Sequence, residues 1–233
     1  MKNIIIASTS TVHGTSNLEY LLPRLSTFYK NVKTVLFIPY ARPGGISYDD
    51  YTEVARKAFK TIGIAVQGIH EGKDIKAALL QAEGIFTGGG NTFELVNQLY
   101  KKDVLEPLKK AVLNGTPYLG TSAGSNICGQ TMMNTNDMPI VYPPSFDTLG
   151  FIPFNINAHY LDPDPTSKHM GETRETRIKE YHVFNDIPVL GLREGSWLEV
   201  LGDTIILKGN YTARLFQQNQ KPIELETNTK VVI

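Results

Sequence analysis

The amino-acid sequence predicts an α/β protein with a mostly parallel sheet, helices on both faces of that sheet, and a strand-rich C-terminal part. Two observations support this fold class. Short, continuous apolar runs alternate with segments of helical periodicity through the first half of the chain, and runs of this length are typical of strands buried on both faces. After Cys128 helical periodicity persists in one segment, and the remaining residues show the patterns that are typical of strands and loops.

The expected strands of the first half are four or five apolar residues long, or slightly shorter, and are bounded by polar or turn-forming residues. They are expected at residues 4–7, 34–38, 64–66, 84–87 and 117–119. Strands that alternate with helical segments form βαβ units. The sequence therefore predicts a parallel arrangement for these strands.

The helices between these strands are recognised by apolar residues at three- and four-residue spacing. Ser16 and Asn17 are expected to cap a first helix, although Pro23 falls in its middle. Ser47 is expected to open a second helix, and Gly63 to end it. Further helices are expected at residues 75–80, 92–113, 123–128 and 171–181.

The C-terminal part is expected to consist of strands and loops. Alternation predicts a strand at 154–158, and residues 197–201 and 204–207 form a hairpin signal around Gly202-Asp203. A second pair is expected between 213–216 and 231–233. Because repeats and a linker are lacking in the sequence, we expect residues 1–233 to form a single domain.

Composition narrows the class of protein. Hydrophobic residues make up 41% of 233 residues, enough for one well-buried core. Lys and Arg number 23 and so do Asp and Glu, a balance that argues against nucleic acid or an anionic membrane as the main partner. The single Cys128 fits a reducing cytosol. With no apolar run approaching about 18 residues, we expect a soluble, cytoplasmic protein.

Gly120-Thr121-Ser122-Ala123-Gly124 matches the G-x-S-x-G pattern of a nucleophile elbow. It follows a short expected strand and precedes an expected helix, which is the context that this motif requires. The elbow exposes the serine on a tight turn, and the helix N-terminus offers N–H groups to an oxyanion. The alternative is a plain Gly-Ser turn between a strand and a helix.

Gly88-Gly89-Gly90 follows the fourth expected strand and precedes a helix that Asn91 or Thr92 would cap. Strand ends of this kind line the ligand crevice of parallel α/β sheets. Glycines let backbone N–H groups approach a substrate closely, so we favour an oxyanion hole over a plain turn. A phosphate loop is disfavoured because neither G-x-G-x-x-G nor G-x-x-x-x-G-K-S/T is present.

A serine nucleophile needs a base and an acid that orients the base. His159, at the end of an expected strand and the start of a polar loop, is the best-placed base. His13 is a weaker rival, His70 is expected to be structural or exposed, and a solvated role is expected for His169 and His182. The candidate acids are Asp137, Asp147, Glu172 and Glu194, which residue patterns alone do not rank. Cys128 is expected to be a small buried helix residue.

An ordered set of blocks resembles the peptidase E family of aspartyl dipeptidases, with cyanophycinase as a more distant relative. The resemblance covers nearly the whole chain. Its blocks are Gly88–Phe93, Gly120–Gly124, Thr135–Ile140, Phe154–His159, Lys168–Arg174 and Gly191–Trp197. It implies a fold similar to class I glutamine amidotransferases and a serine peptidase activity that needs no metal or organic cofactor.

Carried across residue by residue, the resemblance implies that Ser122 is the nucleophile and His159 the general base. Glu194 is preferred over Asp137 as the partner of His159, and the other carboxylate is available for the substrate amine. The implied oxyanion donors are the N–H groups of Gly90 and Ala123. Gly89 and Asn91 are expected beside the substrate.

Members of this family remove N-terminal aspartate from short peptides, chiefly Asp-X dipeptides, so the expected partner is a small acidic peptide. Its side chain calls for a cation, preferably arginine. Arg174 is our choice, with Lys168, Arg177 and Arg193 as alternatives. The chain is expected to be a monomer or small homo-oligomer.

Two positions depart from the family pattern. Thr121 stands where an aromatic residue is frequent, and Arg193 where proline is frequent. Arg193 is expected to lower the pKa of Glu194 or to compete with His159 for it. The alternative functions are a cyanophycinase-like hydrolase of β-aspartyl-arginine units and a non-catalytic protein that binds an acidic metabolite.

Overall fold

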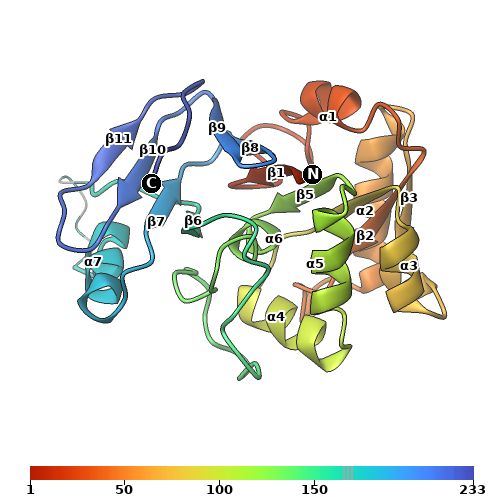
Figure 1. The fold of residues 1–233 in the computed structure, drawn as a ribbon, viewed down its shortest axis with the longest axis horizontal. Helices are drawn as coiled ribbons and strands as arrows, with labels where there is room; N and C mark the ends of the chain where they lie inside the picture. Colours follow the sequence, from red (N-terminus) through yellow and green to blue (C-terminus); the bar gives the residue numbers. More distant parts are fainter. Residues whose placement is uncertain (165, 167, 169) are drawn as a thin grey trace.

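The computed structural model describes every residue except 165, 167 and 169. Its larger sheet has seven strands in the order β3-β2-β4-β5-β1-β8-β9 (Figure 1). The pairs from β3 to β1 are parallel, whereas β8 and β9 run antiparallel to their neighbours. The strands are β1 (Asn3–Ala7), β2 (Thr34–Ile38), β3 (Ala65–Gly68), β4 (Gly84–Thr87), β5 (Tyr118–Thr121), β8 (Ser196–Leu201) and β9 (Thr204–Gly209).

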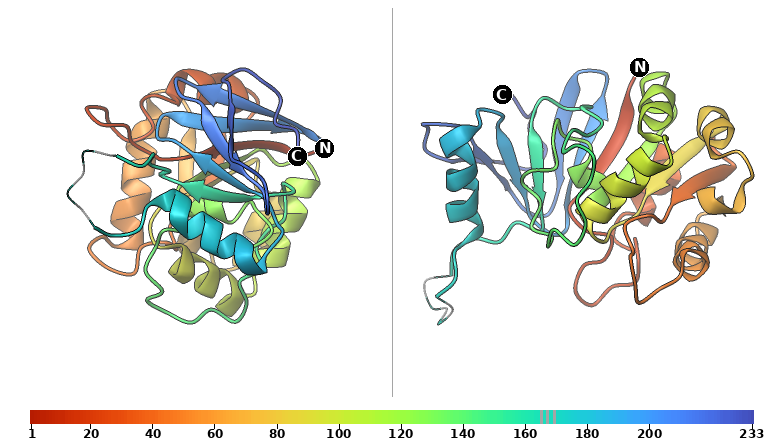
Figure 2. Two further views of the ribbon diagram at one scale, coloured as in Figure 1. Left: turned by 90° about the vertical axis from the view of Figure 1, so that its left-hand side faces the viewer. Right: turned by 90° about the horizontal axis from the view of Figure 1, so that it is seen from below.

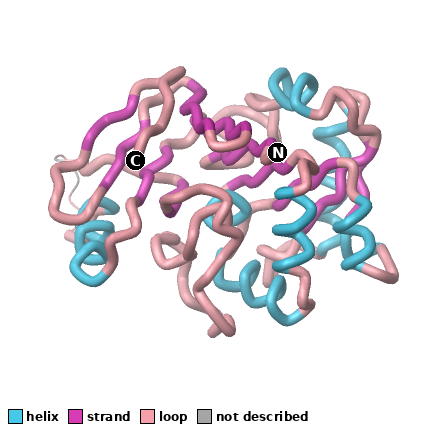
Figure 3. Tube along the Cα trace, viewed as in Figure 1, coloured by secondary structure: helices cyan, strands magenta, loops and turns pink. Residues whose placement is uncertain are grey.

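A second sheet of four strands has the order β11-β10-β7-β6. β6 pairs with β7 in parallel, and the other pairs are antiparallel. This sheet lies at one end of the molecule with α7, away from α2 and α3 (Figures 1 and 3). The strands are β6 (Asn155–Ala158), β7 (Val189–Leu192), β10 (Ala213–Phe216) and β11 (Ile223–Leu225).

Seven α-helices and one short 3-10 helix, η1, are assigned in the described part of the chain. Figure 2 shows from two further sides that α7, in cyan, lies at the same end of the molecule as the second sheet. None of the helices described is both long enough and apolar enough to cross a membrane. The helices are α1 (Leu22–Phe28), α2 (Tyr48–Lys60), η1 (Ile69–Glu71), α3 (Ile75–Gln81), α4 (Thr92–Lys101), α5 (Leu105–Leu113), α6 (Ala123–Asn126) and α7 (Arg174–Phe184).

Both faces of the larger sheet are covered. Ile4 and Ile6 of β1 belong to one buried cluster, which includes side chains of α3, α4 and α5. Ile5 and Ala7 belong to another, which includes side chains of α1 and α2. Successive side chains of a strand point to opposite faces, so the helices form a layer on each side. The predicted fold class is confirmed.

Three element predictions were wrong. The first helix begins at Leu22 rather than Ser16, with Pro23 in its first turn, where the missing N–H costs nothing. The expected helix at 92–113 is two helices, because Asp103 has a φ of 51°, which a continuous α-helix excludes. Residues 231–233 do not pair with β10, whose partners are β7 and β11.

Candidate active site

The tight turn from β5 into α6 carries Ser122. Its backbone has a φ of 52° and a ψ of −111°, which few residues with a side chain adopt. A Cβ on Gly120 would lie 2.3 Å from the Gly124 carbonyl oxygen, and one on Gly124 would lie 2.2 Å from the Thr87 carbonyl oxygen. The two glycines therefore permit a turn that raises the serine at the carboxyl edge of the sheet.

His159 reaches this serine from the second sheet, immediately after β6. Its Nε2 lies 2.8 Å from Ser122 Oγ, and its Nδ1 lies 2.6 Å from Glu194 Oε1. A carboxylate only accepts hydrogen bonds, so Glu194 favours the tautomer that carries the proton on Nδ1. Nε2 is then free to accept the hydroxyl proton of Ser122. The three side chains form one hydrogen-bonded chain.

Glu194 lies in the turn between β7 and β8, where Gly195 has a φ of 85°. This turn directs the carboxylate toward the imidazole of His159. Both side chains are partly open to solvent, with 37% of His159 and 46% of Glu194 exposed. A peptide entering the site can therefore reach the hydrogen-bonded chain.

Asp137 has a different set of partners. Its Oδ2 accepts hydrogen bonds from the Thr92 N–H at 2.7 Å, the Thr92 hydroxyl at 2.6 Å and the Thr135 hydroxyl at 2.8 Å. Thr92 is the first residue of α4, so this carboxylate supports a helix N-terminus. Among the described residues the structure brings Glu194, and not Asp137, to His159.

The triple glycine packs directly against the elbow. A Cβ on Gly89 would lie 2.9 Å from the Ser122 Cβ, and one on Gly90 would lie 2.2 Å from the Ala41 carbonyl oxygen. Gly90 also has a φ of 142°. Only glycine fits this path, which brings the loop's backbone against Ser122.

Two backbone N–H groups near Ser122 have no acceptor among the described residues. Ala123 is the first residue of α6, and the first N–H groups of a helix have no intrahelical acceptor. No described residue accepts a hydrogen bond from the Gly90 N–H. Asn91 instead caps α4 by accepting from the Glu94 N–H, and its Nδ2 donates to the Met138 carbonyl oxygen.

A family model described as peptidase family S51 matches residues 4–208 of the chain. The chain belongs to this family. A peptidase E of Streptomyces coelicolor is 50% identical over 96% of this chain and 90% of its own length. A Drosophila melanogaster protein named "Probable alpha-aspartyl dipeptidase" is 45% identical, over 96% of this chain and 93% of its own.

A solved structure supports the fold of this S51 chain. The crystal structure of a peptidase from an acI-B1 actinobacterium superposes with a TM-score of 0.73, covering 100% of this chain and 97% of the other. Its sequence is 14% identical, so the likeness concerns the fold alone. Membership of S51 makes the chain a serine peptidase by family.

Arg174 opens α7 after the N-cap Thr173. It lines a pocket of about 370 Å³ together with Arg177 and Glu172. Partial burial and the nearby Arg177 lower the pKa of Arg174, while Asp137 opposes that shift. Arg177 lies 3.9 Å from Glu172, whereas Arg174 forms no ion pair with any described residue. Its charge is therefore available to an anionic ligand.

Arg193 does not contact Glu194, contrary to the expectation from the sequence. Its guanidinium bonds Asp162 through two nitrogens at 2.8 and 2.7 Å, and donates to Glu224 at 3.0 and 3.1 Å. These hydrogen bonds raise the pKa of Arg193 further above its usual value, although partial burial opposes the rise. The guanidinium of Arg193 is paired with Asp162 and Glu224. The neighbouring Glu194 therefore keeps its hydrogen bond to His159.

The other histidines lie apart from the hydrogen-bonded chain. His13 is exposed, and His70 pairs with Asp49. His182 is buried, with Nδ1 3.0 Å from the Asn185 carbonyl oxygen, so its predicted solvated role was wrong. It occupies the α7 face that packs on the second sheet. His169 lies outside the described residues.

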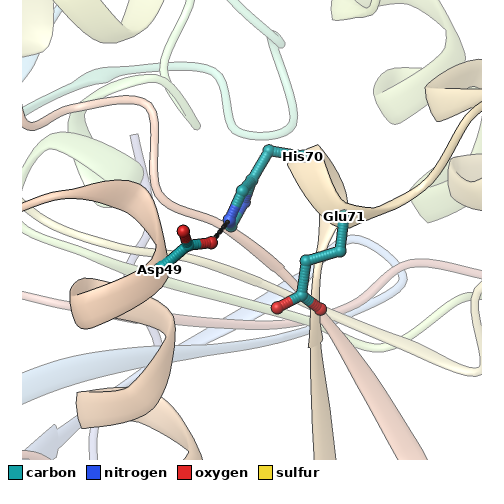
Figure 4. Close-up of side chains that lie close together, drawn as sticks. All are labelled: Asp49, His70 and Glu71. Atoms are coloured by element: carbon teal, nitrogen blue, oxygen red, sulfur yellow. Dashed lines mark hydrogen bonds and ion pairs between the residues drawn. The ribbon is translucent and has the colours of Figure 1, made fainter.

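A second group of titratable side chains surrounds His70 (Figure 4). Ligand atoms of Asp49, His70 and Glu71 lie within 4.8 Å of one another. However, His70 Nε2 lies 2.9 Å from Asp49, and Glu71 accepts hydrogen bonds from Arg56 and from the Gly68 N–H. These contacts account for the group as part of the α2–η1 junction.

Cys128 is buried, as predicted. Burial raises the pKa of its thiol well above the usual range, although a hydrogen bond with Tyr118 opposes the shift. The thiolate is the nucleophilic form of cysteine. Cys128 is therefore no rival to Ser122.

Sequence reasoning missed the residues that hold His159 in place. Ser8 accepts the backbone N–H of His159 at 2.9 Å. Asn126 and Asn136 bond the N–H and the carbonyl oxygen of Ala158, at 3.3 and 2.8 Å. The position of Ser8 directly after a buried strand is a signal that could have found it, because such strand ends line the crevice.

Proposed function

We propose that this S51 peptidase hydrolyses Asp-X dipeptides with Ser122 as nucleophile, His159 as general base and Glu194 as the acid that orients His159. The observation that carries the proposal is the continuous chain from Ser122 Oγ to His159 at 2.8 Å and on to Glu194 at 2.6 Å. The names of the S. coelicolor and D. melanogaster relatives support the substrate class.

The reaction has two steps. Ser122 Oγ bonds to the carbonyl carbon of the N-terminal residue while its proton passes to His159 Nε2. The N–H groups of Gly90 and Ala123 stabilise the oxyanion. His159 then gives the proton to the leaving amine as the peptide bond breaks. A water molecule attacks the ester by the same route, which releases aspartate and restores the Ser122 hydroxyl.

Arg174 binds the aspartate side chain of the substrate. Its guanidinium offers paired donors that match a carboxylate, and no described carboxylate competes for it within ion-pair distance. Arg174 is the last residue of the block Lys168–Arg174, one of those that carry the resemblance to the family. Asp137, Gly89 and Asn91 flank the substrate position, and the amine of the substrate faces Asp137.

The proposal extends to the substrate, the compartment and the oligomeric state. The substrate is a small acidic peptide, and the enzyme acts in the cytoplasm as a monomer or small homo-oligomer. The single cysteine among 233 residues, with no disulfide framework, supports a reducing compartment.

Purified protein assayed against Asp-X, Glu-X, Ala-X and β-Asp-Arg dipeptides tests the proposal. We expect Asp-X to be cleaved with the highest kcat/KM, and Ser122→Ala to lower kcat by at least about 10³-fold. Preference for β-Asp-Arg would support the cyanophycinase-like alternative. Binding of acidic dipeptides without cleavage of any would support a non-catalytic role. Full activity of Ser122→Ala would exclude the mechanism.

A further inference from the structure

The dipeptide Ala7–Ser8, at the carboxyl end of β1, contacts the backbone of both the nucleophile and the base. The Ala7 carbonyl oxygen accepts the N–H of Ser122 at 3.1 Å. The Ser8 hydroxyl accepts the N–H of His159 at 2.9 Å. Ser122 follows a strand of the larger sheet and His159 follows a strand of the second sheet. Both are hydrogen-bonded to neighbouring residues at the carboxyl end of β1.

Ser8 also bonds both sides of the turn that carries Glu194. Its hydroxyl donates to the Leu192 carbonyl oxygen at 2.7 Å, and its backbone N–H donates to the Ser196 carbonyl oxygen at 3.1 Å. Leu192 ends β7 and Ser196 begins β8. Ser8 therefore bonds the residues two positions before and two positions after Glu194, and it also bonds the backbone of His159.

Water cannot replace the Ser8 hydroxyl as a hydrogen-bonding group at this position. Ser8 is fully buried, so water cannot take over its hydrogen bonds, and the hydroxyl uses its donor and an acceptor site at once. His159 has a φ of 55°, a conformation that persists only when surrounding contacts impose it. Removal of the hydroxyl would leave the His159 N–H without a partner among the described residues, and would leave the Leu192 carbonyl oxygen with the Tyr160 N–H, at 3.1 Å, as its one remaining donor among them.

We propose that Ser8 is a positioning residue for the reaction. Its hydroxyl sets the spacing between the backbone of His159 and the turn of Glu194, and so keeps the imidazole in line with Ser122. This inference rests on the proposed roles of Ser122, His159 and Glu194. Ser8 itself acts through His159 and Glu194.

The test compares Ser8→Ala with Ser8→Thr, which keeps the hydroxyl, and with Thr148→Val. Thr148 is a matched control because its hydroxyl is also buried and bonds a backbone carbonyl oxygen, that of Gly129, at 2.7 Å. A displacement of about 1 Å at a reacting group costs about 10²-fold in rate. We therefore expect Ser8→Ala to lower kcat for Asp-X by about 10²-fold, with a small change in KM.

Two further readouts separate positioning from general stability. The rate at which a fluorophosphonate labels Ser122 should fall with Ser8→Ala, and this readout does not depend on the peptide substrate. The second readout is KM for Asp-X, which should stay close to the wild-type value because Ser8 contacts the backbone of His159 and the turn of Glu194 and not the substrate. Ser8→Thr should recover most of both rates, and Thr148→Val should keep wild-type values.

A wild-type kcat and a wild-type labelling rate in folded Ser8→Ala would overturn the positioning role and leave the proposed nucleophile intact. Full peptide hydrolysis by Ser122→Ala would instead overturn the proposed function. If Ser8→Ala does not fold, Ser8→Cys preserves the volume and weakens both hydrogen bonds. Intermediate rates for Ser8→Cys support the proposal, and wild-type rates contradict it.

Discussion

Glu194 and Asp137 show how the same side-chain chemistry serves different purposes at two positions. Glu194 is partly exposed and contacts an imidazole, whereas Asp137 accepts three hydrogen bonds around the start of α4. A carboxylate that orients a base matters most when that base gains charge during the reaction. One that supports a helix N-terminus contributes to folding in every state of the reaction.

Substitution of the two acids should therefore have separable effects. Glu194→Gln is expected to lower kcat by about 10²- to 10⁴-fold, because the amide no longer fixes the Nδ1–H tautomer of His159. Asp137→Asn is expected to lower the free energy of unfolding by about 1–3 kcal/mol and, because the substrate amine faces Asp137, to raise KM more than it lowers kcat. Steady-state kinetics and urea unfolding measure the two effects. Glu106→Gln, at an exposed position of α5, serves as control, and an unchanged kcat in Glu194→Gln would contradict the assignment.

Arg174→Lys tests the specificity at the same scale. Lysine keeps the charge but lacks the planar pair of donors, so KM for Asp-X should rise by about tenfold or more while that for Ala-X stays constant. Arg177→Lys is the matched control, since it lines the same pocket and already has Glu172 nearby. An equal rise in KM for Asp-X and Ala-X would show that Arg174 does not bind the aspartate side chain.

At the scale of elements, the loop between β4 and α4 is shaped by close backbone contact. Gly90 lies against the Ala41 carbonyl oxygen, which also accepts the Asn91 N–H at 2.7 Å. The loop that follows β2 and the loop that follows β4 are thus joined beside Ser122. Because β2 and β4 are adjacent and parallel, their carboxyl ends meet at the same edge of the sheet.

Gly90→Ala should disturb this contact. The new Cβ would lie 2.2 Å from the Ala41 carbonyl oxygen at a φ of 142°, so the loop must move. We expect a loss of about 2–3 kcal/mol in the free energy of unfolding and a fall in kcat of at least about 10²-fold. Gly44→Ala, where a Cβ meets nothing within 4 Å, should change neither. Thermal unfolding and steady-state kinetics of both variants measure these effects, and equal values for the two variants would contradict the prediction.

At the scale of the whole molecule, Arg193 joins segments of the C-terminal part that are distant in sequence. It bonds Asp162 in the loop after β6, the Thr212 carbonyl oxygen and Glu224 in β11. Hydrogen bonds from Arg193 lower the pKa of Asp162, against the opposing effect of burial. Burial alone would raise the pKa of Glu224, but hydrogen bonds from Arg193 and Thr212 lower it overall.

These shifts predict how stability depends on pH. A carboxyl group with a lowered folded-state pKa stabilises the protein above its unfolded pKa, near 4, and this contribution is lost as pH falls through the folded pKa. Urea unfolding should therefore show declining stability from about pH 5 to pH 3, and Arg193→Gln should reduce that slope. Lys76→Gln, which removes an exposed ion pair with Asp103, should leave it unchanged.

Much of the fold was predictable from local patterns. Strands β1, β2, β4 and β5 of the larger sheet coincide with short apolar runs because they are buried on both faces. The pairing of residues 231–233 was mispredicted, since partner choice is spatial. Local signals predicted one helix over residues 92–113 and missed the break after Lys101, because Asp103, a residue of positive φ, marks that break without a glycine or proline.

The sequence by itself determined the class of fold, the elbow around Ser122 and the glycine loop beside it, because each depends on residues that are neighbours in the chain. The tertiary structure alone decided that Glu194, and not Asp137, contacts His159, that Arg193 points away from Glu194, and that Ser8 bonds the backbone of His159. These are contacts between segments up to 151 residues apart. Their geometry arises only when β6 and the β7–β8 turn pack against the end of β1.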